Sequence, residues 1–292
     1  MADQFDVIEA GDRGRRRWVG LGVVVALLAV PVIGLLVSRE PEPESAPPAE
    51  TSSPIRTLTR IEGAPNLLRA PVQAKGGDEV IRVVFPDGTR ADVRYPADLR
   101  LNELGARPFQ GIWVGQNYRG LYAPWGGEME ITRGGQPIRN FAPNVTLWPR
   151  QPGGSFGQML MFAFGKWRLA MYDRPEGLSF EDRMAAAKSV RGKVGKDGYL
   201  VLSGGGAVRL ARPGETAEGG LIGPQLWFGG GAGDMVALIP MPDCRTGERM
   251  PSQANNRGRP ARTVCRGDML IAASGSRSFV DTAVAKIRIT LK

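Results

Sequence analysis

The chain has 292 residues and a formal net charge of +9, and 42% of its residues are hydrophobic, as in ordinary globular proteins. Its 40 glycines and 23 prolines favour many turns and short strands. Because it contains no histidine and only two cysteines, histidine-dependent acid–base catalysis and a four-ligand zinc site of cysteine and histidine are excluded. We therefore expect no cofactor and no bound metal.

The first expected element is a membrane span over residues 18–37 (WVGLGVVVALLAVPVIGLLV), a run without charge. As a helix it would be ~30 Å long, the thickness of the bilayer core. A buried core helix and a cleaved signal peptide are the alternatives, but the run is long and no A-x-A site follows closely. Four arginines stand directly before it: Arg13, Arg15, Arg16 and Arg17. The positive-inside rule then places residues 1–17 in the cytoplasm and the rest of the chain outside.

Residues 38–56 (SREPEPESAPPAETSSPIR) are rich in proline, glutamate and serine and show no apolar periodicity. This composition is typical of an extended, semi-rigid stalk. Residues 57–292 then form an extracytoplasmic domain, for which we expect a mainly β, antiparallel fold. A sandwich, a barrel and a small propeller all remain open.

Pairs of apolar runs around short turns predict hairpins in this domain. They are residues 80–85 with 89–95, 159–164 with 167–172, 199–202 with 207–211, and 225–228 with 235–239. Residues 283–291 predict a final strand. Ser179 and Asp182 resemble a capping box, which predicts a helix that continues over residues 183–190.

A basic flank, one span, an acidic proline-rich stalk and a domain carrying FPDGTRADVRY at residues 85–95 form a distinctive arrangement. The chain resembles uncharacterised single-pass membrane proteins of actinobacteria in this architecture and in this motif. The resemblance implies a location in the cell envelope. It carries no catalytic residues over to this sequence.

Cys244 and Cys265 are the only cysteines, and outside the membrane such a pair predicts a disulfide bond. A C-x-x-C spacing, which redox catalysis would need, is absent. The loop between them is rich in arginine and should be exposed, and arginine suits phosphate and carboxylate ligands. The candidate binding residues are Arg245, Arg249, Arg257, Arg259, Arg262 and Arg266. An ordinary solvated basic loop is the alternative interpretation.

Other motifs give weaker signals. Ser155 lies in a literal G-x-S-x-G pattern, but no histidine exists to activate it. Glu128 and Glu130 lie beside Tyr122 and Trp125, and paired carboxylates near aromatic rings would suit sugar hydrolysis. On a strand, residues two apart share one face, so the same pattern also fits an ordinary half-exposed strand.

The sequence therefore favours a non-enzymatic, membrane-anchored binding protein of the cell envelope. Its expected partners are the membrane itself and an anionic envelope polymer or an acidic protein, contacted through the arginine-rich loop. Nucleic acid is not expected, because the predicted topology puts this loop outside the cell. A carboxylate-dependent hydrolase and a structural subunit of a membrane complex remain as alternatives.

Overall fold

The computed structural model describes residues 66–151, 156–230, 233–245 and 258–292. Within these ranges no helix is both long and apolar enough to cross a membrane. The predicted cytoplasmic tail, span and stalk lie outside the described residues, as does Ser155 of the G-x-S-x-G pattern.

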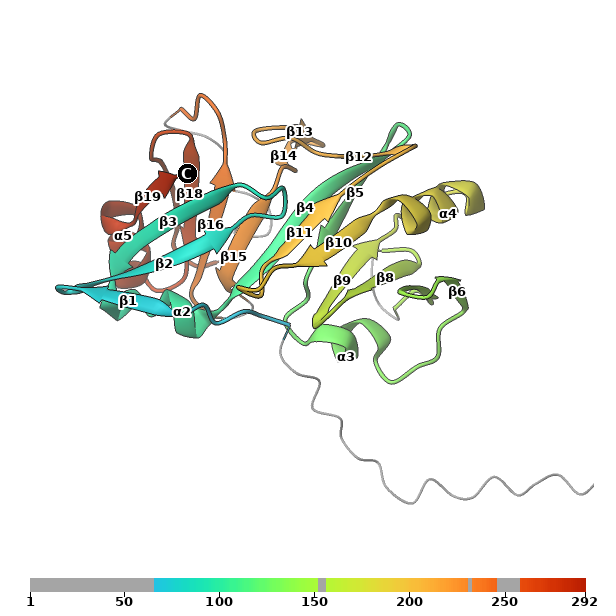
Figure 1. Ribbon diagram of the computed structural model, residues 1–292, viewed down its shortest axis with the longest axis horizontal. Helices are drawn as coiled ribbons and strands as arrows, with labels where there is room; N and C mark the ends of the chain where they lie inside the picture. Colours follow the sequence, from blue (N-terminus) through green and yellow to red (C-terminus); the bar gives the residue numbers. More distant parts are fainter. Residues whose placement is uncertain (1–65, 152–155, 231–232, 246–257) are drawn as a thin grey trace, which may run out of the picture. The chain divides into compact units, whose positions relative to one another are not determined.

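Two antiparallel sheets dominate the described part of the chain, which confirms the expected mainly β fold (Figure 1). The large sheet has eleven strands in the order β17-β18-β16-β15-β4-β5-β9-β8-β7-β6, with β12 paired to β4. The strands of the large sheet are β4 (Ala106–Val114), β5 (Asn117–Tyr122), β6 (Arg139–Ala142), β7 (Val145–Trp148), β8 (Met159–Phe164), β9 (Trp167–Tyr172), β12 (Val208–Leu210), β15 (Gln225–Gly229), β16 (Met235–Pro240), β17 (Ala261–Cys265) and β18 (Met269–Ser274). The small sheet, in the order β1-β2-β3-β19, consists of β1 (Val72–Lys75), β2 (Asp78–Val84), β3 (Arg90–Pro96) and β19 (Arg288–Leu291).

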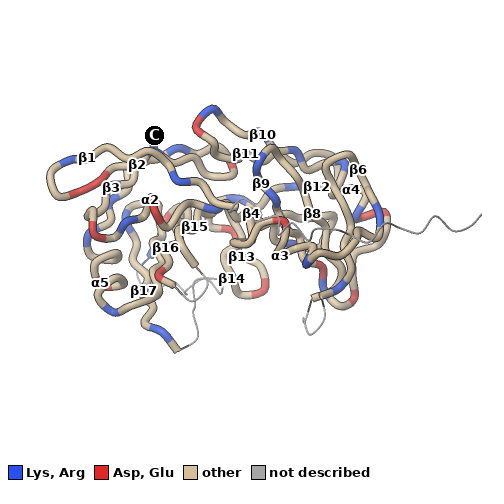
Figure 2. Tube along the Cα trace, turned by 90° about the horizontal axis from the view of Figure 1, so that it is seen from below, with Lys and Arg blue, Asp and Glu red and all other residues tan. Residues whose placement is uncertain are grey.

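Two further hairpins and several short helices complete the fold. The hairpins are formed by β10 (Arg191–Val194) with β11 (Leu200–Ser203), and by β13 (Thr216–Ala217) with β14 (Gly220–Leu221). The helices are η1 (Ala97–Leu99), α2 (Leu101–Leu104), α3 (Gly127–Thr132), α4 (Phe180–Ser189) and α5 (Arg277–Lys286). Figure 2 shows the small sheet and β10–β11 on one side of the large sheet and β13–β14 on the other.

The main apolar core lies between the large sheet and the small sheet. On the small sheet, Ile81 and Val93 are fully buried, while the alternate residues Arg82 and Arg94 are exposed. Alternation of this kind turns one face of a strand inward and the other toward water. α5 packs on β18, β17 and β3 and so closes one end of this core. The two sheets thus pack face to face, as in a sandwich of unequal layers.

Three of the four predicted hairpins are confirmed: β2–β3, β8–β9 and β15–β16. In the first, the side chain of Asp87 accepts hydrogen bonds from the backbone N–H and the hydroxyl of Thr89, at 3.0 and 2.9 Å. Gly88 adopts φ = +92°, a conformation that glycine reaches without the steric cost of a side chain. The helix after Ser179 is also confirmed as α4, since the Ser179 hydroxyl accepts a hydrogen bond from the N–H of Asp182.

The third hairpin, predicted from residues 199–202 and 207–211, is wrong. β11 pairs with β10 instead, and β12 pairs with residues 112–114 of β4. β4 is nine residues long, but β15 pairs only with its residues 106–109. The remaining edge of β4 would leave backbone groups unpaired, and β12 supplies their partners.

Two other local predictions are corrected. Residues 283–286 belong to α5 rather than to a final strand, because Phe279, Val280, Ala283 and Val284 are buried at helical spacing. The strand begins only at Arg288. Glu128 and Glu130 lie on α3 and not on a strand. The buried residues of α3 are Gly127 and Ile131, four apart, so both segments follow a helical repeat and not the two-residue repeat of a strand.

The predicted disulfide between Cys244 and Cys265 is confirmed, with the two Cα atoms 5.7 Å apart. It ties the segment after β16 to the end of β17, and both cysteines pack against an apolar cluster on the outer side of the large sheet. Closing a loop of this length restricts the unfolded chain.

Reducing this disulfide is expected to lower the free energy of unfolding by about 3 kcal/mol, the chain-entropy value for a loop of roughly 20 residues. Urea denaturation with and without a reducing agent measures the change. The Cys244→Ser/Cys265→Ser double variant should match the reduced protein and should not respond to the reducing agent. If the reducing agent also lowered the free energy of unfolding of this variant, the disulfide would not be the source of the effect.

Candidate functional site

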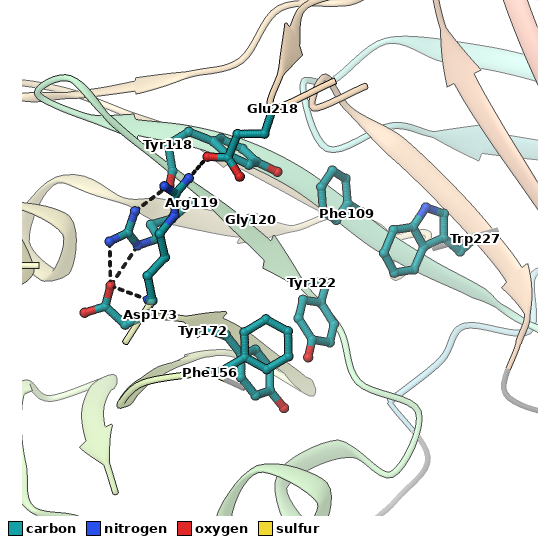
Figure 3. A pocket seen from close by; sticks show the side chains of 11 residues that line it. Phe109, Tyr118, Arg119, Gly120, Tyr122, Phe156, Tyr172, Asp173, Glu218 and Trp227 are labelled. Carbon is teal, nitrogen blue, oxygen red and sulfur yellow. Dashed lines mark hydrogen bonds and ion pairs between the residues drawn. The ribbon is translucent and has the colours of Figure 1, made fainter. Parts of the chain in front are cut away.

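A cavity of about 430 Å³ opens on the face of the large sheet that points away from the small sheet. Strand alternation assigns the two faces: on β5, Leu121 points into the main core, whereas its neighbours Gly120 and Tyr122 line the cavity. Its volume is within the range of about 300–1,000 Å³ typical of small-molecule sites. The cavity is lined by Phe109, Tyr118, Arg119, Gly120, Tyr122, Phe156, Tyr172, Asp173, Arg174, Glu218 and Trp227 (Figure 3).

Aromatic rings from four neighbouring strands form two of its walls. Phe109 on β4 stacks on Trp227 of β15, with ring centroids 4.9 Å apart and planes 17° apart. Tyr122 on β5 stacks on Tyr172 of β9 at 5.1 Å and 8°. Phe156 lies over Tyr172 at 5.1 Å with its plane tilted by 53°. These offset contacts between neighbours hold the rings in place, so the walls are formed before any ligand arrives.

Trp227 is fixed from two further sides. Its indole N–H donates to the side-chain oxygen of Gln225 at 2.9 Å. The guanidinium of the buried Arg107 lies 5.8 Å from its ring centroid, within the range of a cation–π contact. A tryptophan held in this way offers a defined surface to a ligand.

At one edge of the cavity lies the buried carboxylate of Asp173, which by strand alternation points, with Arg119, toward the main-core side of the large sheet. Arg119 pairs with it through Nη2 at 2.7 Å, and Arg183 on α4 through Nη2 at 3.0 Å. The backbone N–H groups of Leu178 and Arg174 donate to it at 2.6 and 2.9 Å. This cluster joins β5, the end of β9 and α4, and so fixes one wall of the cavity.

The charge of Asp173 is stabilised by these contacts. Burial alone would raise the pKa of this carboxyl, but hydrogen bonds from Leu178, Arg119 and Arg183 outweigh burial and hold the pKa below its ordinary 3.8. Asp173 is therefore ionised at neutral pH, and its oxygens are already engaged. It is a structural anion and a poor proton donor.

A second ion pair, between Arg174 and Glu218, joins two walls of the cavity. Glu218 stands at the turn between β13 and β14, where it has φ = +53°. Both side chains are about half exposed. Unlike Asp173, they can exchange partners with a ligand.

Three tyrosine hydroxyls contribute neutral polar groups. Burial raises the pKa of Tyr122 and Tyr172, and it raises the pKa of Tyr118 to about 12. All three therefore stay protonated at neutral pH, and each hydroxyl can both donate and accept a hydrogen bond.

None of the predicted arginines that the structure describes lines this cavity. Arg249 and Arg257 lie outside the described residues, and Arg245 is exposed beside Cys244. Arg259 is exposed and donates to the backbone oxygen of Gly233 at 3.0 Å.

The last two predicted arginines contact α5. Arg262 pairs with Asp281 at 2.9 Å, and its side chain is 62% exposed. Arg266 donates to the backbone oxygens of Val284 and Ala285 at 2.9 and 3.3 Å. These carbonyls lie in the last turn of the helix, where they have no partner within it. Arg266 therefore stabilises the end of α5.

The glutamates considered for hydrolysis are also engaged elsewhere. Glu128 pairs with Arg168 at 2.9 Å, and the Oε2 atom of Glu130 accepts from the N–H of Gly126 at 2.8 Å. Neither lines the cavity. The sequence singled out only Tyr122 among the cavity residues. The alternation of Tyr118, Gly120 and Tyr122 was the available signal for the rest of this face.

Replacing Asp173 with asparagine is expected to lower the free energy of unfolding by about 3–5 kcal/mol, because it leaves Arg119 buried without its counter-charge. A folded-state pKa below the ordinary value means that this stabilisation is present above about pH 4 and is lost as the pH falls through the folded-state pKa. Urea denaturation at several pH values should therefore show the gap between wild type and Asp173→Asn narrowing in acid. A gap independent of pH would contradict this role.

No protein-family model matches this chain, and neither a curated protein nor a solved structure matches it. The fold and the site described above are therefore the basis for a functional assignment. The cavity is the strongest candidate for a ligand site, because its aromatic walls come from neighbouring strands of the large sheet.

Proposed function

We propose that this chain is a binding protein of the cell envelope, anchored by one helix over residues 18–37, with the aromatic cavity as its ligand site. The observation that carries the binding role is the cavity itself, a preformed space of about 430 Å³ with aromatic walls and a few polar groups. Sites for small molecules have this composition. The two carboxylates that line it are both paired with arginine, which favours binding over acid–base catalysis.

The extracytoplasmic placement is supported by two features. The arginines before residue 18 favour a cytoplasmic N-terminus under the positive-inside rule. The disulfide between Cys244 and Cys265 is of the kind that persists in oxidising compartments and is rare in the cytosol.

Protease treatment of intact cells that carry the chain with a C-terminal epitope tag tests the placement. The tag should disappear while cytoplasmic control proteins survive. A tag that stays protected after the outer layers are permeabilised, and is lost only on lysis, would place the domain in the cytoplasm.

Retention on envelope material purified from the producing cells tests the binding role. The full chain should be used, in a polyoxyethylene detergent. Gly120→Val is expected to reduce retention at least tenfold, because a Cβ on Gly120 would lie 3.1 Å from the Phe109 ring and the side chain would take up space between the aromatic walls. Gly77→Val is the matched control, since a Cβ there meets nothing within 4 Å. Equal retention of both variants would reject the cavity as the site.

The arginine-rich loop is a second candidate contact, for an anionic envelope polymer or an acidic protein. The observation in its favour is the exposed position of Arg245 beside the disulfide. The same assay separates the two sites: Arg245→Glu/Arg257→Glu should reduce retention if the loop binds. The control Arg82→Glu/Arg100→Glu makes the same charge change at side chains that are 74% and 67% exposed.

A further inference from the structure

We infer that the cavity takes an uncharged, hydroxylated ring, namely a pyranose residue of a neutral glycan. This inference rests on the proposed binding function and names the ligand class of the same site. Three properties of the cavity support it: balanced charge, aromatic walls beside polar groups, and a floor without a side chain.

The charged side chains that line the cavity balance one another. Arg119 and Arg174 contribute two positive charges, and Asp173 and Glu218 two negative ones, each arginine paired with a carboxylate. Arg183, the second partner of Asp173, does not line the cavity. A charged ligand beside Arg119 and Asp173 would have to be desolvated next to a group of its own sign or would have to separate a buried ion pair. A neutral ligand meets neither cost. The cavity thus differs from the chain as a whole, which carries +9.

The walls combine apolar and polar surface in a way that suits a sugar. A pyranose ring has faces of C–H groups, which pack on aromatic rings, and a rim of hydroxyls. Phe156 is 53% exposed and offers its ring beside Tyr172. Arg174 and Glu218 also line the cavity and offer a donor and an acceptor to sugar hydroxyls. A purely apolar ligand, such as an acyl chain, would cover these polar groups without giving them partners.

The tyrosines add neutral hydrogen-bonding groups. Burial and the hydrogen bond that Tyr122 donates to Tyr172 both raise the pKa of Tyr122. Tyr118 and Tyr172 stay protonated at neutral pH, so each can donate to a sugar hydroxyl, and Tyr118 can also accept from one. Sugar hydroxyls also act both as donors and as acceptors. A site of this kind can satisfy them without any net charge.

The floor of the cavity is Gly120, and the backbone there does not need glycine. Its φ lies outside the left-handed region, so the conformation is open to other residues. A Cβ would, however, stand 3.1 Å from Cε2 of Phe109 and 3.4 Å from the hydroxyl of Tyr118. Glycine at this position therefore keeps the space between the aromatic walls free. We assign Gly120 as the residue that sets the depth of the site.

Calorimetric titration of the full chain tests the inference. The detergent must have a polyoxyethylene head, because a maltoside would itself present glucose units. The probes are cellotriose, mannotriose and galactotriose, with trigalacturonate as an anionic counterpart that differs from galactotriose by a carboxylate on each ring. At least one neutral trisaccharide should bind, and galactotriose should bind more tightly than trigalacturonate if either binds.

Two exposed phenylalanines provide matched variants. Phe156→Ala should weaken the binding of the neutral trisaccharide about tenfold, as expected for the loss of one stacked ring. Phe180, 49% exposed on α4 and absent from the cavity lining, is the control, and Phe180→Ala should leave the dissociation constant within twofold. Both side chains are about half exposed, so neither truncation should prevent folding.

Binding by none of the neutral trisaccharides, tighter binding of trigalacturonate, or equal effects of the two phenylalanine variants would each overturn the inference. These outcomes differ from failure of the proposed function. If the Gly120→Val variant loses retention on the purified envelope and no neutral trisaccharide binds, the cavity is a binding site for another class of ligand. If retention does not depend on Gly120, the proposed site itself is wrong.

Discussion

Three strands of the large sheet are buried on both faces, and the packing of the other elements follows from this burial. Strands β15, β16 and β18 have no residue exposed to water. One face needs the small sheet and the two longer helices as cover, and this produces the main core. The other face carries a second set of apolar side chains, which the disulfide segment and the β13–β14 hairpin border. Aromatic side chains of this second set, Phe109 and Trp227, also line the cavity.

The buried carboxylate of Asp173 forms part of the cavity lining. A carboxylate removed from water is tolerated only when its oxygens are paired, and here two guanidinium groups and two backbone N–H groups do so. The same contacts hold β5, the end of β9 and α4 together. The site therefore joins a rigid apolar surface to a rigid polar one. This combination is what a ligand with both kinds of surface requires.

The chain as a whole is strongly basic, whereas the charged side chains that line its cavity are paired with opposite charges, so the two favour different classes of ligand. An excess of arginine favours anionic partners at the surface, where Arg245 is exposed. Inside the cavity every charged side chain has an opposite partner, so no such preference remains. In the proposed envelope protein, the cavity takes a neutral ring while the basic surface faces anionic material.

The sequence by itself determined the features that depend on short stretches of chain. The β2–β3, β8–β9 and β15–β16 hairpins follow from alternation around tight turns, α4 from its cap at Ser179, and the disulfide from there being only two cysteines. The pairing of β12 with the edge of β4 and the position of Glu128 on a helix were not predictable from local sequence. The same holds for the cavity, which brings Phe109 together with Trp227 from a strand much later in the chain. The reason is physical: a hairpin is specified by neighbouring residues, whereas pairing between distant strands depends on which edges and faces the remaining strands leave uncovered.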